Sequence, residues 1–432
     1  MAHSHRHTID ITREPRMLGD LGAKLFIPAI IIGLVGLGVT LAMAWFGEPE
    51  LRSRALQGYL VSFMFFLAIG LGSLFFVLIH HLTRAGWSVT VRRIAEGLAT
   101  NLAWMAVLFL PLLWGLFDPS IEIFPWADPH RLDHNSSHFD ALVAHKAAYL
   151  NTTFFIIRAA IYFAVWAFLS RYFFNLSVRQ DETGDVELSH RMAAISAPGM
   201  ILFALTLTFA AFDWLMSQDP HWFSTIFGVY YFATAVTSFL AATIIACVFL
   251  QRAGRLPNAI TTEHFHDLGK LMFAFGAVFW AYIAYSQYML QWYGNLPEET
   301  NWWQPRASTL LATISGHSGE FQPGAWNYWT TALLLLHFCI PFVALVSRVP
   351  KRRPMVLMVL AFWMLAVCWF DIFWLVMPVF HPSHASLELT DFLSLIGFAG
   401  VFIGLLAGRM RNVALVPEKD PRLEESLAFE NL

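Results

Sequence analysis

The segment 58–82, GYLVSFMFFLAIGLGSLFFVLIHHL, decides the fold because it contains no Lys, Arg, Asp or Glu from end to end. An α-helix needs about 20 predominantly apolar residues to cross the hydrocarbon core of a bilayer. The segment meets that length, so the sequence predicts a transmembrane helix here. The pair Gly70 and Gly72 in its middle indicates close packing against a neighbouring helix, or space for a flat ligand.

Similar apolar runs recur along the whole chain. With the first one included, the sequence predicts ten transmembrane helices, at about 22–46, 58–82, 94–117, 149–173, 193–216, 224–250, 269–293, 326–348, 355–380 and 391–410. The predicted fold class is therefore an all-α polytopic membrane protein.

The overall composition supports this class. Hydrophobic residues make up 57% of the 432 residues and charged residues only 13%, against roughly 25% charged residues in ordinary globular domains. So little charge cannot cover a water-soluble surface, and a net charge of −3 argues against a nucleic-acid-binding protein. The polar first residues and the length of the first apolar run argue against a cleaved signal peptide.

The distribution of basic residues predicts the orientation. Most of the 27 Lys and Arg residues lie at the two termini and in the loops after predicted helices 2, 4, 6 and 8. Because Lys and Arg favour the cytoplasmic side, both termini are expected in the cytoplasm. Arg92 and Arg93 belong to this group as residues of the connection after helix 2. The loops on the other side hold Arg52, Arg54, Arg131, Lys146 and Arg306.

An internal repeat relates two parts of the chain. Phe212-Asp213 is followed by Pro220, and Phe370-Asp371 is followed by Pro378 at the same spacing. Trp114 and the pair Thr152-Thr153 recur 178 positions later as Trp292 and Thr330-Thr331. We therefore expect two parallel four-helix bundles, helices 2–5 and 6–9, flanked by helices 1 and 10. The predicted units are 1–21 (cytoplasmic segment), 22–57 (flanking helix 1), 58–223 (first bundle), 224–390 (second bundle) and 391–432 (helix 10 and cytoplasmic tail).

Four ionisable side chains fall inside predicted spans. Such groups are costly in a bilayer and commonly mark a functional site. Each also has a purely structural alternative: Arg158 would be neutralised by an acid on a neighbouring helix, the histidine would be a hydrogen-bonded core residue, and the aspartates would cap a turn before the proline. The repeat favours a role in proton exchange. These residues are Arg158, Asp213, His337 and Asp371.

A second titratable cluster lies at the cytoplasmic ends of the helices. Histidines beside carboxylates exchange protons readily near neutral pH, whereas the alternative for 263–267 is a solvated loop before helix 7. With the four groups above, this cluster gives the candidates for a transmembrane proton path. Its members are His80, His81, Glu96, Glu263, His264, His266 and Asp267.

The sequence predicts no redox cofactor and no metal in this chain. Cys247, Cys339 and Cys368 lie in apolar runs and form no C-x-x-C pair, haem-attachment motif or iron–sulfur spacing. His80 and His81 lie at a helix end, so they form no bis-histidine haem site with His337. We expect no catalytic residues.

The pattern resembles a known family. Ten spans arranged as two four-helix bundles with two flanking helices are the layout of the NrfD/PsrC-like membrane subunits of quinone-linked oxidoreductases. The run 212–228, FDWLMSQDPHWFSTIFG, and Gly70-Leu71-Gly72-Ser73 with His80-His81 are most similar to the ActF type of subunit in bacterial alternative complex III.

The resemblance implies a non-catalytic subunit of a respiratory or photosynthetic quinol:cytochrome c oxidoreductase in the bacterial inner membrane. Haem c and iron–sulfur clusters would lie in partner subunits, which include c-type cytochromes, an iron–sulfur subunit and a sibling NrfD-like subunit. A quinone or menaquinone pocket in this chain stays open, because the sibling's quinone ligands do not match residue by residue. The alternatives are a structural anchor of the same complex and a stand-alone secondary transporter.

Overall fold

The computed structural model describes residues 14–118, 120–315 and 325–431, and within these ranges the ordered structure is helical apart from one isolated bridge. Ten helical segments in the described chain are long and apolar enough to cross a membrane. The protein is thus an all-α polytopic membrane protein, as predicted. The spans are α1 (Asp20–Phe46), α2 (Pro49–Leu82), α3–α5 (Val89–Ala99, Leu102–Leu108, Leu110–Gly115), α7 (Thr152–Thr183), α8 (Glu187–Trp214) with η3 (Met216–Gln218), α9 (Phe227–Arg252), α10–η4–α11 (Thr262–Met272, Phe273–Phe279, Trp280–Gly294), α13–η5–α14 (Asn327–Leu333, Leu334–Cys339, Ile340–Val346), α16 (Pro354–Phe380) and α17 (Leu389–Met410).

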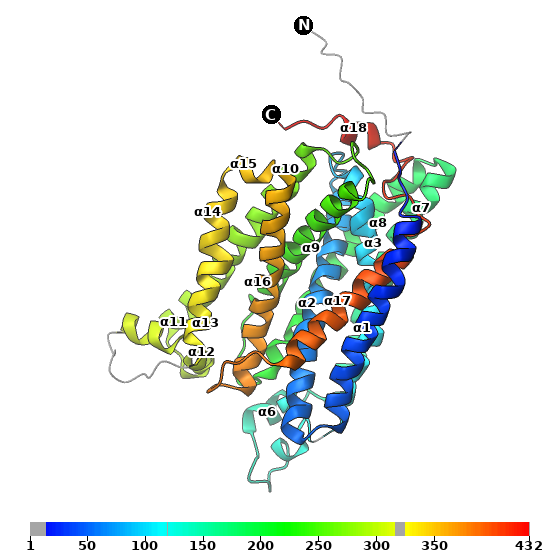
Figure 1. Cartoon of the computed structure of the whole chain (residues 1–432). Coiled ribbons are helices and arrows are strands. Elements are labelled where there is room, and N and C mark those ends of the chain that lie inside the picture. The colour runs from blue at the N-terminus through cyan, green and yellow to red at the C-terminus, as the bar shows by residue number, and fades with distance from the viewer. Residues whose placement is uncertain (1–13, 119, 316–324, 432) are drawn as a thin grey trace.

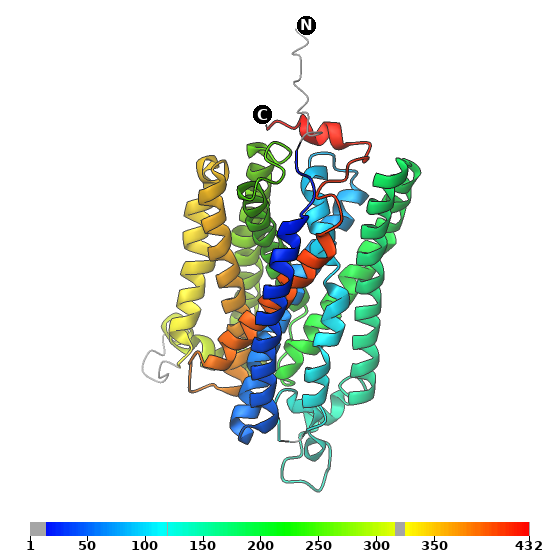
Figure 2. The same cartoon turned by 45° about the vertical axis from the view of Figure 1, so that its right-hand side comes forward.

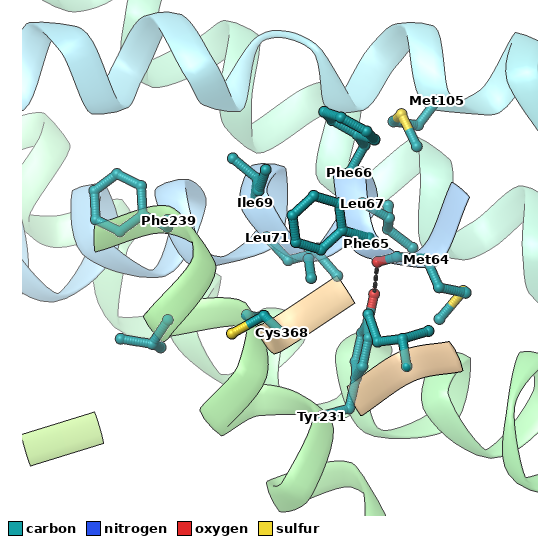
Figure 3. Packing of buried hydrophobic residues seen from close by; sticks show 14 of the residues in the cluster. Met64, Phe65, Phe66, Leu67, Ile69, Leu71, Met105, Tyr231, Phe239 and Cys368 are labelled. Carbon is teal, nitrogen blue, oxygen red and sulfur yellow. Dashed lines mark hydrogen bonds between the residues drawn. The ribbon is translucent and has the colours of Figure 1, made fainter. Parts of the chain in front are cut away.

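Helices α2 and α9 form the centre of the molecule. They are the first helices of the two predicted bundles, and 89% and 78% of their apolar windows are buried inside the protein. A Cβ atom on Gly72 would lie 2.1 Å from the carbonyl oxygen of Ala235, so the glycine permits this close approach. Tyr231 donates a hydrogen bond to the carbonyl of Met64 across the same contact (Figure 3). The apolar core therefore runs between the two predicted bundles.

Helices α1 and α17 lie side by side along one flank of the molecule (Figures 1 and 2). Glycines of both helices meet at their crossing. A Cβ on Gly33 would lie 2.4 Å from the backbone nitrogen of Val401, and one on Gly400 would lie 2.5 Å from the nitrogen of Gly33. Without side chains between them, the two backbones gain the dense packing that holds helices together in lipid.

Both described chain ends lie at one end of the bundle, which we call the terminal face. Met17 pairs with Ala414 in the isolated bridge, and Arg16 forms an ion pair with Glu418 at 3.0 Å. Helix α6 (Ala141–Lys146) lies at the opposite end, which we call the distal face (Figure 1). The predicted cytoplasmic segment up to residue 13 lies outside the described residues.

Three sequence predictions of local structure are wrong. Helix α3 begins at Val89, so Arg92 and Arg93 are buried helix residues and not parts of a solvated connection. Helix α10 begins at Thr262, because Thr261 caps its first turn, so residues 263–267 form that turn and not a loop. Helix α12 (Pro297–Ser315) lies between the predicted spans 269–293 and 326–348, where the sequence predicts a connecting loop.

The remaining elements are short: η1 (Pro125–Ala127), η2 (Pro129–Arg131) and α15 (Arg348–Lys351) lie in connections between spans, and α18 (Leu423–Leu427) follows the last span.

Candidate functional site

Arg158 and Asp213 form a buried ion pair between α7 and α8. The guanidinium group donates two hydrogen bonds to the carboxylate, from Nε at 2.8 Å and from Nη2 at 2.9 Å. Tyr162 donates a third to Asp213 at 2.8 Å, while Arg158 packs over the ring of Tyr149 at 3.9 Å. The acid predicted to neutralise Arg158 is thus Asp213. The negative charge of Asp213 is compensated by the guanidinium group of Arg158, and its carboxylate bonds these side chains and does not cap a turn.

Asp371, the predicted repeat equivalent of Asp213, has different surroundings. Its carboxyl group accepts hydrogen bonds from the hydroxyl of Tyr230 at 2.5 Å, the hydroxyl of Thr234 at 3.2 Å and the indole of Trp280 at 3.1 Å. The side chain is completely buried, and no basic residue of the described chain forms an ion pair with it. Three neutral donors therefore hold this acid in place without a counter-ion.

His337 lies next to this site. Its ring stacks on that of Trp280 with centroids 3.8 Å apart, and Trp280 in turn bonds Asp371. Neither ring nitrogen of His337 has a hydrogen-bond partner in the part of the chain that the structure describes. His337 belongs to the π-helical η5, and Trp280 directly follows the π-helical η4. Such π-turns are rare and frequently occur at functional sites.

The cluster at the terminal face brings His81 and Glu96 together. Glu96 accepts a hydrogen bond from Nε of Arg93 at 3.0 Å, and its other oxygen lies 3.4 Å from Nε of Arg92 and 4.0 Å from Nε2 of His81. A separation of 4.0 Å is too long for a direct hydrogen bond. Both facing atoms of His81 and Glu96 are buried and lack partners among the described residues. The arrangement suits one bridging water molecule.

Arg92 and Arg93 connect Glu96 to two further acids. Arg93 donates to Asp181 at 2.7 Å and to Ser177 at 3.0 Å, and Arg92 forms an ion pair with Asp420. Two guanidinium groups thus meet three carboxyl groups inside the protein.

The other candidates at the terminal face do not join this network, and each contacts a partner of its own. His80 bonds the carbonyl of Phe76 in its own helix at 2.7 Å. Glu263 pairs with Arg352, and Asp267 pairs with Lys270. His264 is completely buried, with its Nε2 3.2 Å from the hydroxyl of Ser426, whereas His266 is half-buried. Of the titratable candidates in 263–267, only His264 is buried in the interior.

Sequence reasoning missed the residues that hold these groups. Tyr162, Tyr230, Thr234 and Trp280 are ordinary residues for an apolar helix, so no signal marks them as donors. A second buried pair at the distal face joins Arg54 to Asp391 at 2.5 Å. The signal for this pair was the position of Asp391 within the first turn of a predicted span.

Two cavities open at the distal face, and neither fits a quinone ring. One has a volume of about 400 Å³ and is lined mainly by charged and polar groups that include Arg54, His381 and Glu388. The other, of about 350 Å³, lies among the connecting loops and includes Arg131, Asp219 and His221. A quinone ring favours a predominantly apolar pocket, and these two cavities do not have that lining.

The fold and the buried charges together define a polytopic helical membrane protein with paired and unpaired ionisable groups inside its spans. Comparison with protein-family models and with curated protein sequences finds no match to this chain.

Proposed function

We propose that this protein carries protons part of the way across the membrane and that Asp371 is the central group of the path. The observation that carries the proposal is the difference between two equivalent positions of the predicted repeat. Asp213 is fixed by a bidentate ion pair with Arg158, whereas Asp371 is held by three neutral donors. A carboxyl group without a counter-ion can gain or lose a proton without breaking an ion pair.

The entry to this path is proposed at the terminal face. The ion network there contains Arg92 and Arg93 against Glu96, Asp181 and Asp420, so it has one carboxyl group more than it has guanidinium groups. One further proton can be shared between Glu96 and the neighbouring His81 while the ion pairs stay intact. Protons from the water on this side would load this cluster first.

Hydroxyl groups along α9 point to the route between the two sites. Tyr230 and Thr234 bond Asp371, and Ser238 and Thr243 follow on the same helix towards the terminal face. The hydroxyls of Ser238 and Thr243 are buried and have no partner within the described ranges. Buried hydroxyls of this kind are commonly satisfied by internal water. Residues 230–243 cover about 20 Å at 1.5 Å per residue.

The wider context of the proposal comes from the sequence resemblance. The protein would be an NrfD/PsrC-like subunit of a quinol-oxidising complex in the bacterial inner membrane, with both termini in the cytoplasm. Partner subunits would carry haem c and iron–sulfur clusters, and quinol oxidation would take place outside this chain. The proton path would couple that reaction to the membrane potential.

The test compares Asp371→Asn with Asp213→Asn in the complex purified from native membranes and reconstituted into liposomes. The proposal predicts that Asp371→Asn lowers the number of protons translocated per electron while quinol oxidation continues. Asp213→Asn, at the equivalent position, should change the proton yield much less once assembly is shown to be intact. An unchanged proton yield in Asp371→Asn would contradict the proposal and favour a structural anchor.

A further inference from the structure

The last part of the chain lies across the terminal face. Residues 418–431, with α18 (Leu423–Leu427), form a segment that we call the terminal cap (Figures 1 and 2). The cap begins after Pro417, next to the strand-like contact in which Leu415 donates to the carbonyl of Arg16 at 2.7 Å. The preceding Val416 is completely buried. Residues 414–416 are therefore anchored, and the cap extends from that anchor.

Asp420 is the first of two polar attachments of the cap to α3; before it, Glu418 pairs with Arg16 and Lys419 donates to the carbonyl of Glu182. Asp420 forms an ion pair with Arg92, and the two side chains are 5% and 4% exposed. Arg92 also lies 3.4 Å from Glu96. The cap therefore contributes a carboxylate directly to the ion network that surrounds the proposed proton entry.

Ser426 is the second attachment. Its hydroxyl donates to the carbonyl of Trp87 at 2.6 Å and accepts from the backbone of Thr90 at 3.3 Å. Nε2 of His264 lies 3.2 Å from the same oxygen. A single buried serine thus joins the start of α3 to the start of α10.

The cap lies against Arg92, which in turn contacts Glu96 beside His81. Glu96 is 1% exposed and His81 is 5% exposed; His81 lies at the end of α2, and Glu96 lies two turns into α3. At the end of the cap, Asn431 bonds Lys270 at 2.8 Å and the carbonyl of Glu263 at 3.3 Å. With the cap in this position, the entry cluster is closed to the aqueous phase.

We propose that the terminal cap is a gate, which must lift from Arg92 and His264 before protons can reach Glu96 and His81. The cap is a short segment held by a few polar contacts, by the buried side chains of Leu423 and Leu427, and by the ring of Phe429 against Trp87 and His264. Such segments open locally at a lower free energy than the whole protein unfolds. This inference rests on the proposed proton function, because it assigns the control of entry to the same path.

The first experiment measures access beneath the cap. Ser88 is completely buried at the start of α3, so Ser88→Cys, in a chain whose three native cysteines are replaced, reports opening through its reaction with a membrane-impermeant maleimide. Asp420→Asn and Ser426→Ala together remove both attachments and should increase the labelling rate about tenfold. A tenfold larger population of the open cap corresponds to ~1.4 kcal/mol in the free energy of opening. Arg422→Gln is the matched control, because Arg422 pairs with Glu425 inside the cap.

The second experiment closes the gate reversibly. A Cβ on Gly86 would lie 2.2 Å from the side chain of Glu425, so Gly86→Cys with Glu425→Cys places two thiols at this contact. Oxidation should lower the proton yield of the reconstituted complex, and reduction should restore it, which excludes misfolding as the cause.

The outcomes separate the gate from the path. Unchanged labelling after removal of both attachments, or a proton yield insensitive to the locked cap, would overturn the gate. If the locked cap has no effect while Asp371→Asn still lowers the yield, the proposed function stands and only the gate fails. If neither the locked cap nor Asp371→Asn lowers the proton yield, both the gate and the proposed proton path are overturned.

Discussion

The ion pair between Arg158 and Asp213 gives the sharpest prediction on stability. Arg158→Leu removes two of the three hydrogen bonds to a carboxyl group that has no exposed surface, and leaves only the hydroxyl of Tyr162. Breaking a buried pair by removing one partner costs about 3–5 kcal/mol. The free energy of unfolding of Arg158→Leu should fall by that amount.

The reverse substitution should be milder. In Asp213→Asn the guanidinium group keeps the carbonyl of Tyr149 at 2.9 Å and the rings of Tyr149 and Phe154 at 3.9 and 4.4 Å. The amide also still accepts one hydrogen bond, so a loss of about 1–3 kcal/mol is expected. The double variant Arg158→Leu/Asp213→Asn leaves no unpaired charge and should be more stable than Arg158→Leu alone.

Equilibrium unfolding in mixed detergent micelles measures all three variants, with His337→Leu as a control in the second bundle. The coupling energy of the cycle should be at least ~2 kcal/mol, at the upper end of what neighbouring residues show. Additive losses, with the double variant as unstable as the sum of the two single ones, would refute the argument that the pair is fully desolvated.

Two further predictions concern packing and pH. Gly33→Ala should destabilise the contact between α1 and α17, because its Cβ would lie 2.4 Å from the backbone of Val401. Gly38→Ala is the control, because no atom lies within 4 Å of the position of its Cβ. Thermal unfolding in detergent should show a lower midpoint for Gly33→Ala only. Burial lowers the pKa of His381, whose Nε2 lies 2.8 Å from Oε1 of Gln57. Because the unfolded histidine, with a pKa of about 6.5, then binds protons that the folded one does not, stability should fall as the pH drops below about 6.5. His381→Gln should weaken this dependence, and an equal dependence in both proteins would contradict it.

The sequence predicted the ten spans because a bilayer imposes a length and an apolar composition that a single chain reveals directly. It predicted the helix ends less well. Because Arg92 and Arg93 are basic, they were expected in a solvated connection after the second span. Helix α3 instead begins at Val89 and buries both residues against Glu96, Asp181 and Asp420. A buried charge and a solvated charge look the same in a sequence until the partner is known.

The candidate site shows the same limit. Asp213 and Asp371 were identified by their shared spacing to a proline, and nothing in that spacing distinguishes one aspartate from the other. Their difference depends on which neighbours reach them across helices, Arg158 for one and Trp280 for the other. The ion pair of Asp420 with Arg92 could not be predicted either, because the sequence around Asp420 is as polar as that of a solvated tail.

As the proposed central group of the proton path, Asp371 should change its protonation state during turnover, while Asp213 should not. Redox-induced infrared difference spectroscopy of the purified complex measures this directly, through the C=O stretch of a protonated carboxyl group. We expect a carboxyl band that disappears in Asp371→Asn and persists in Asp213→Asn. A band that persists in Asp371→Asn, or one that disappears in Asp213→Asn alone, would contradict it.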